Sequence, residues 1–354
     1  MTTHTRSGQL VRLGLVALAY ALTVRVGAGF FTSASGLPTL LPSAGLLLGW
    51  LIATERRDWP LIAGLAAVAH GVASPLFWTA PLASAAQSVA EAGATIACAV
   101  VMAGGGSLQR TEKKVVRNLM RFFSGAGLVG APAYAVVATL VAPRGPSLEL
   151  FVASGLAYAL GIVVAAPLVL TAHEGATWLR TAGWRPKVEL LVAAALVVAM
   201  VFFAYLTPVA QAEKFRWVNV LVVPPLLWAG MRIGTFAGAW TAAIVGLAVA
   251  FGMSAGLGLT EALPGSELTH FILSALYIGI ISTVSLTTAV LFGGLKRALT
   301  ALESTERWFR DLADSSPLAM IVIEPDERTL VFNRALVDLY GYGADEIRTV
   351  DSFW

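Results

Sequence analysis

Ten apolar runs, each close to the length of a membrane span, divide most of this 354-residue chain. A helix needs about 20 apolar residues to cross the hydrocarbon core of a bilayer. Because no water satisfies backbone polar groups there, we expect every run to be a helix. The eighth run is the weakest candidate, since it is short and contains Pro224 and Pro225. The runs cover residues 9–29, 37–54, 59–78, 80–103, 119–142, 147–172, 188–206, 215–231, 233–256 and 268–295.

The composition also indicates a membrane protein. Apolar residues make up 57% of the chain and charged residues 13%, whereas soluble domains average about 45–50% and about 25%. A soluble protein with so few charges would expose large apolar patches and aggregate. The sequence therefore excludes a soluble enzyme, a disordered chain and a nucleic-acid-binding domain as the bulk of the molecule. It predicts an all-α polytopic membrane protein with about ten transmembrane helices.

The charges in the loops orient the predicted bundle. If the N-terminus is inside, the inner loops contain 15 Lys and Arg residues, and the outer loops contain only Arg144, Lys214 and Arg216. Loops rich in Lys and Arg stay in the cytoplasm. We therefore expect both termini to be cytoplasmic.

Charge divides the chain into two unlike parts. Residues 1–297 contain 19 Lys and Arg against 10 Asp and Glu, whereas residues 298–354 contain 5 against 11. The net charge of +3 thus averages a basic membrane part and an acidic tail.

A periodic apolar stripe begins at the end of the last run. Its members are spaced three and four residues apart, which predicts a linker helix over 296–315 with a heptad-like face. Such a helix would couple the bilayer to a soluble module through Leu295, Leu302 and Phe309, and would favour a homodimer. An ordinary amphipathic linker is the alternative. The stripe consists of Leu295, Ala298, Leu302, Thr305, Phe309 and Leu312.

The tail after residue 315 predicts a small α+β unit. Residues 319–324 and 329–333 are strand candidates separated by a turn at Pro325 and Asp326. Residues 334–340 form a helix candidate that Gly341 ends.

This tail resembles the start of a PAS domain. The resemblance rests on Ser316-Pro317, the strand at 320–323, "VFN" at 331–333, "LYGY" at 339–342 and "DEI" at 345–347. A PAS domain is about twice as long, and two strands with about 40 residues bury too little for a core of their own. The resemblance therefore implies that residues 316–354 are an incomplete PAS fragment, with the remaining sensor and an output module missing.

The membrane part resembles the first type of bacterial membrane-associated sensor domain, the MASE family. The resemblance covers most of residues 10–295 and implies a sensor domain over 1–295 in the bacterial inner membrane. Such sensors precede PAS domains and then histidine kinase, diguanylate cyclase or related output domains. The matching segments are "LPSAGLLLGWLI" (41–52), "RRDWPLIAGLAA" (56–67), "LASAAQSVAEAGATIA" (82–97), "GLAYALGIVVAAPLVL" (155–170) and "VPPLLWAGMRIGTFAGAW" (223–240).

Polar residues inside the runs are the candidate functional residues, because burying them in a bilayer is costly. Arg25, His70 and Glu91 lie about 6, 12 and 16 Å below the outer ends of their spans at 1.5 Å per residue, and Gln87 is one turn above Glu91. We expect Arg25, His70, Gln87 and Glu91 to form an outward-facing ligand pocket or a salt-bridged latch. The stimulus would be a small molecule or a proton acting through His70. A structural polar cluster, or an Arg25 that extends to the interface, is the alternative.

Catalytic and metal chemistry have little support in the sequence. The single cysteine, Cys98, forms neither an internal disulfide nor a cysteine zinc site. The four histidines show no ligand spacing, and no Walker A, HExxH or G-x-S-x-G motif occurs. We predict no catalytic residue, no cofactor and no metal.

The predicted function is the sensory input of a bacterial signalling protein, with a histidine kinase of a two-component system as the expected output. A diguanylate cyclase or phosphodiesterase is the alternative output. A small-solute transporter would also explain ten spans with buried charges, but a coupled PAS start is unexpected in a carrier. An intramembrane enzyme would need a catalytic pair, for which His70 with Glu91 is the only candidate. The expected partners are the lipid bilayer, a second copy and the stimulus, with no nucleic acid.

Overall fold

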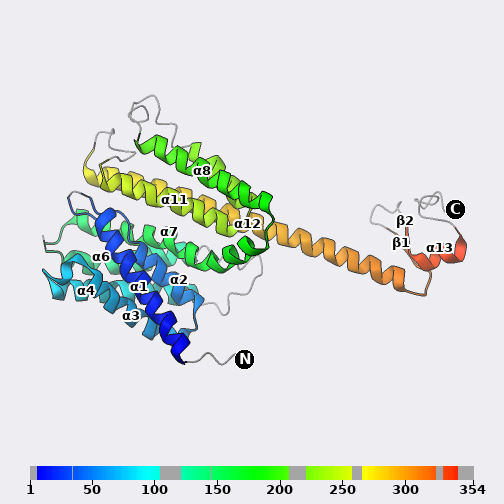
Figure 1. Cartoon of the computed structure of the whole chain (residues 1–354), viewed down its shortest axis with the longest axis horizontal. Coiled ribbons are helices and arrows are strands. Elements are labelled where there is room, and N and C mark those ends of the chain that lie inside the picture. The colour runs from blue at the N-terminus through cyan, green and yellow to red at the C-terminus, as the bar shows by residue number, and fades with distance from the viewer. Residues whose placement is uncertain are drawn as a thin grey trace. The chain divides into compact units, whose positions relative to one another are not determined.

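A computed structural model describes residues 6–33, 35–103, 121–143, 145–206, 221–256, 265–323 and 330–341. The chain divides into two compact units, residues 1–293 and 294–354. The first unit is helical (Figure 1). Its longer elements are α1 (Arg6–Phe30), α2 (Pro42–Ala53), α3 (Trp59–Ala73), α4 (Pro81–Ala103), α6 (Ala131–Leu140), α7 (Leu148–Thr181), α8 (Trp184–Leu206), α10 (Val223–Arg232), α11 (Thr235–Ser254) and the first part of α12 (Glu267–Ser315).

Seven helices among the described residues are long and apolar enough to cross a membrane. Three others, α2, α3 and α10, have only 12, 15 and 10 residues. Proline lies in the first turn of each of these three, where its fixed φ suits a helix start. At 1.5 Å per residue they fall short of a core about 30 Å thick. All ten predicted runs contain helix, but ten full-length spans stay a prediction. The helices of spanning length cover Leu13–Phe30, Pro81–Ala103, Arg121–Leu140, Leu148–Thr181, Trp184–Phe203, Thr235–Ser254 and Glu267–Ser315.

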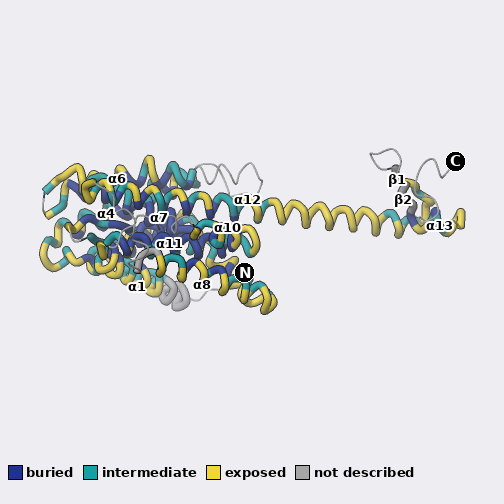
Figure 2. The backbone as a smooth tube through the Cα atoms, turned by 90° about the horizontal axis from the view of Figure 1, so that it is seen from above, coloured by how far each residue is buried: buried dark blue, intermediate teal, exposed yellow. Residues whose placement is uncertain are grey.

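Helix α7 is the centre of the first unit. It contacts α2 and α6 on one side and α11 on another (Figure 1). Tyr158 and Ile162 belong to a core cluster shared with α1–α4 and α6, whereas Leu160 and Val164 belong to a second cluster shared with α8, α10, α11 and α12. Two residues along a helix turn the side chain by about 200°. Opposite faces of α7 therefore serve the two cores. Figure 2 shows the buried segments of the chain in dark blue.

Two glycines let α2 and α7 touch backbone to backbone. A Cβ on Gly161 would overlap the carbonyl of Leu41, and a Cβ on Gly45 would overlap the carbonyl of Gly161. The Leu41 amide donates to the Ala157 carbonyl at 3.1 Å. Small residues that allow such approach are typical of packed membrane helices.

A π-helical segment, η3 (Gly125–Gly130), precedes α6 directly. Its sequence, GAGLVG, contains three glycines. The Cys98 thiol on α4 donates to the Gly125 carbonyl at 3.1 Å. The segment is therefore fixed to α4 at its first residue.

The second unit contains the last part of α12, strands β1 (Ile321–Ile323) and β2 (Leu330–Phe332), and α13 (Arg334–Tyr340). The strands pair antiparallel, with Ile321 opposite Phe332. Helix α13 ends at Gly341, whose φ of +79° is left-handed. These elements lie within the ranges that the sequence predicts for two strands and a helix.

Asn333 joins the parts of the second unit. Its Nδ2 donates to the carbonyls of Ala313 and Leu318, each at 2.8 Å. Its Oδ1 accepts from the amides of Met320 at 2.8 Å and Leu336 at 3.1 Å. One buried amide side chain thus connects the end of α12, the segment before β1 and the start of α13.

Candidate functional site

A buried acid and base meet between α3 and α4. His70 Nδ1 lies 2.8 Å from Glu91 Oε2, and Glu91 has 0% exposure. His70 is in the last turn of α3, and Glu91 is near the middle of α4. A carboxylate without water requires a partner, because its desolvation costs several kcal/mol. The pair therefore holds the two helices together at this level.

Tyr20 completes the cluster from α1. Its hydroxyl donates to Glu91 Oε1 at 2.8 Å, while Oε2 is the oxygen that lies near His70 Nδ1. Tyr20 is 1% exposed, and its ring centroid lies 6.4 Å from that of His70. Three helices that are separate in sequence meet at this Tyr20–His70–Glu91 cluster.

A chain of polar contacts continues along α4 from Glu91. The Thr95 hydroxyl donates to the Glu91 carbonyl at 2.7 Å and lies 2.9 Å from the Tyr158 hydroxyl on α7. The Tyr158 hydroxyl lies 3.9 Å from Cys98 Sγ, and the Cys98 thiol donates to the Gly125 carbonyl. These polar contacts connect the Tyr20–His70–Glu91 cluster with α7 and with η3.

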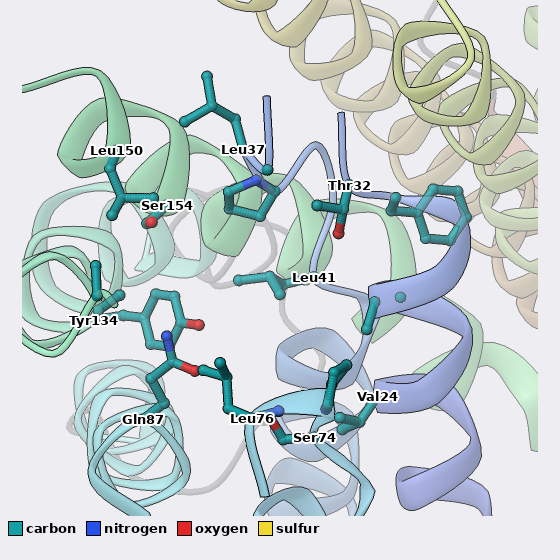
Figure 3. A pocket seen from close by; sticks show the side chains of 18 of the residues that line it. Val24, Thr32, Leu37, Leu41, Ser74, Leu76, Gln87, Tyr134, Leu150 and Ser154 are labelled. Carbon is teal, nitrogen blue, oxygen red and sulfur yellow. The ribbon is translucent and has the colours of Figure 1, made fainter. Parts of the chain in front are cut away.

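A pocket of about 820 Å³ lies at the end of the bundle where α1 ends and α4 begins. His70 is in its lining, so the Tyr20–His70–Glu91 cluster lies at its inner wall. Figure 3 shows Gln87, Tyr134 and Ser154 on one side of the pocket and Val24 on the other. The lining comes from α1, α2, α3, α4, α6, α7 and the segments that join them.

The structure brings together three of the four residues that the sequence selects. His70 and Glu91 pair directly, and Gln87 and His70 both line the pocket. Arg25 is not part of this group, because it lies on the exposed face of α1. Its neighbour Val24 is buried and lines the pocket, and one residue turns a helix by about 100°.

Sequence reasoning missed Tyr20. A tyrosine in an apolar run is easily read as an interface residue. The sequence does contain one signal: Tyr20, Val24 and Gly27 are spaced as residues on one face of a helix are. In the structure all three are buried on that face.

The predicted coupling residues are on α12. Leu295, Leu302 and Phe309 are exposed by 53%, 66% and 64%. They lie seven residues apart within one uninterrupted helix of 49 residues. Their apolar side chains are therefore available on one helical stripe.

The match to a family model decides what kind of protein this is. The model of the MASE1 family matches residues 10–294, which include most of α1, the helices α2 to α11 and the first part of α12. The chain belongs to the MASE1 family. No curated protein and no solved structure matches it.

MASE1 is a membrane sensory input domain of signalling proteins. The MASE1 match and the seven apolar helices indicate a multi-pass membrane protein. The MASE1 match ends at residue 294, at the boundary between the two compact units. The pocket and the Tyr20–His70–Glu91 cluster lie wholly within the MASE1 part, and a binding event there would act on non-covalent contacts among α1, α3 and α4.

Proposed function

We propose that this chain is the sensory input module of a bacterial signal-transduction protein and that the Tyr20–His70–Glu91 cluster is its stimulus-responsive latch. The observation that carries the proposal is a buried histidine–glutamate contact of 2.8 Å beside an open pocket in a membrane sensor domain. Ionisable groups inside membrane domains are generally functional because they are costly to keep there.

The latch has two ways to respond. A ligand in the pocket changes the surroundings of His70, and a proton changes the charge balance of the pair. Either stimulus can shift the latch only if it binds one arrangement of the helices more tightly than the other. The cluster spans α1, α3 and α4, so its opening changes the packing of these helices.

The change is passed to α12 and from there to the tail. We propose that residues 316–354 are the start of a PAS domain, supported by the β1–β2 hairpin and α13 in the expected order. Leu295, Leu302 and Phe309 form the contact of a homodimer of linker helices. Their seven-residue spacing and exposure support this arrangement.

The pocket faces outward in the proposed topology. With ten spans and both termini in the cytoplasm of a bacterial inner-membrane protein, Arg56 and Arg57 lie on the cytoplasmic side. They follow α2 directly, whereas the pocket is at the start of that helix.

A histidine kinase is the proposed output of the parent protein. Membranes that contain the parent protein should then transfer the γ-phosphate of ATP to a histidine. Production of cyclic di-GMP from GTP instead would show a diguanylate cyclase.

Disulfide crosslinking of the linker helix tests the latch and its coupling together. We expect Leu302→Cys to crosslink between copies in membranes more than Thr300→Cys, which lies off the stripe. Adding Glu91→Gln should change the Leu302→Cys yield, because it removes the negative charge of the latch. Cys98 is buried and serves as the constant background thiol. Equal yields at both positions contradict the dimer, and a yield that ignores Glu91→Gln contradicts the coupling.

A further inference from the structure

Three polar side chains face the pocket from three helices without a hydrogen bond to any described residue. They are Gln87 on α4, Tyr134 on α6 and Ser154 on α7 (Figure 3). Tyr134 is 5% exposed and Ser154 is 2% exposed. Buried hydroxyl and amide groups are normally hydrogen-bonded. Their partner in this pocket is therefore water or the polar group of a bound molecule.

The rest of the lining mixes apolar side chains with further polar ones, among them Thr32, Ser74 and Glu149. Val24, Leu37, Leu41, Leu76 and Leu150 surround the three polar groups (Figure 3). Pockets that combine apolar walls with a few placed polar groups are typical of small-molecule sites. A volume of about 820 Å³ is within the range of such sites.

The described part of the pocket lining contains one carboxylate and no Lys or Arg. That carboxylate belongs to Glu149. His70 is already engaged by Glu91 at 2.8 Å. An anionic group would thus meet Glu149 and find no cation among the described lining residues.

We propose that the pocket binds a small uncharged amphiphile, whose hydroxyl or amide group bonds to Gln87, Tyr134 and Ser154 and whose apolar body packs on the leucines. The side chains supply both donors and acceptors, as such a group requires. This inference rests on the proposed function, because it names the chemical class of its stimulus.

The anchoring residues also reach the polar contacts along α4. The Tyr134 ring stacks on Tyr158, with centroids 5.2 Å apart. Ser154 is one helical turn before Tyr158 on α7. A molecule held by these anchors would therefore contact Tyr134, whose ring packs on the Tyr158 side chain that contacts Thr95.

Fluorine NMR with three matched probes tests the ligand class. The probes are 4-fluorobenzyl alcohol, 4-fluorobenzylamine and 4-fluorobenzoate, added to the full chain in nanodiscs, with empty nanodiscs to subtract partitioning into lipid. We expect the neutral alcohol to broaden most and the benzoate to match empty nanodiscs. In the Tyr134→Phe/Ser154→Ala variant, the alcohol should bind about tenfold more weakly, because two hydrogen bonds are lost.

The matched control is Tyr277→Phe/Ser88→Ala, which removes the same two hydroxyl types outside the pocket lining. It should bind the alcohol like wild type. Benzoate binding as tight as that of the alcohol, or equal loss in both variants, overturns the inference.

The probes also separate this inference from the proposed function. If the alcohol binds as expected but does not change Leu302→Cys crosslinking, the ligand class stands and the sensory role falls. If Glu91→Gln changes crosslinking while no probe distinguishes the pocket variant from its control, the latch stands and the ligand class falls.

Discussion

The Thr95 hydroxyl lies 2.9 Å from the Tyr158 hydroxyl, and this buried contact joins α4 to α7 four residues after Glu91. Thr95 also donates to the Glu91 carbonyl at 2.7 Å. In that arrangement Tyr158 is the donor to Thr95. The position of α7 is thus tied to the backbone of the residue that forms the latch.

A double-mutant cycle measures this link. Thr95→Val and Tyr158→Phe should show a coupling free energy of about 0.6 kcal/mol, and at most about 1.7 kcal/mol, as for other hydrogen bonds between membrane helices. Unfolding in mixed detergent micelles provides the four free energies. Strictly additive losses would mean that the two hydroxyls do not interact.

Removing one member of the buried pair should cost more than removing both. Glu91→Ala leaves His70 and Tyr20 without the carboxylate and should lower the free energy of unfolding by about 3–5 kcal/mol. His70→Leu/Glu91→Leu should be less destabilised, because the buried imidazole is removed with its partner and only the Tyr20 hydroxyl loses a contact. The same detergent unfolding assay tests this. A double variant as unstable as Glu91→Ala would show that the contact between His70 and Glu91 does not set the cost.

Contact between α2 and α7 should depend on Gly161. Gly161→Ala places a Cβ into the Leu41 carbonyl, so the helices must separate. Overpacking of this kind costs about 1–3 kcal/mol. Gly64→Ala is the control, because a Cβ there meets nothing within 4 Å. Thermal stability in detergent should fall for Gly161→Ala only.

Asn333 should be needed for order in the second unit. Asn333→Asp keeps an acceptor for Met320 and Leu336 but loses both donors to Ala313 and Leu318. We expect faster amide exchange at Met320 in Asn333→Ala than in Asn333→Asp, and slowest exchange in wild type. Asp338→Asn, at an exposed position of α13, is the control and should exchange like wild type.

The apolar runs could predict where helices occur but not how long each one is. Residues 37–41 are apolar enough to read as helix, yet they lie outside α2, and Thr32 forms a bridge with Pro38. Helix α2 begins at Pro42 and ends at Ala53, before the basic turn. Hydropathy averages over a window and does not detect such an extended entry.

The structure places His70 beside Glu91, whereas Arg25 lies on the exposed face of α1. The ends of a predicted span determine how deep a residue lies in the bilayer. Which neighbours the residue faces depends on how the helix is rotated about its axis. Rotation follows from packing against neighbours that are distant in sequence, such as the contact of Tyr20 with Glu91, 71 residues away. The hydropathy of a helix's own residues does not determine that rotation.

The π-helical turn at Gly125–Gly130 sets which side of α6 meets the ligand site. A π turn closes its hydrogen bonds one residue later than an α turn, and each residue rotates a helix by about 100°. Loss of one residue here would restore a regular helix and turn Tyr134 away by about that angle. The number of residues before α6 therefore determines which of its side chains line the pocket. Insertion or deletion, more than substitution, is the kind of change that would give a descendant of this chain a different ligand.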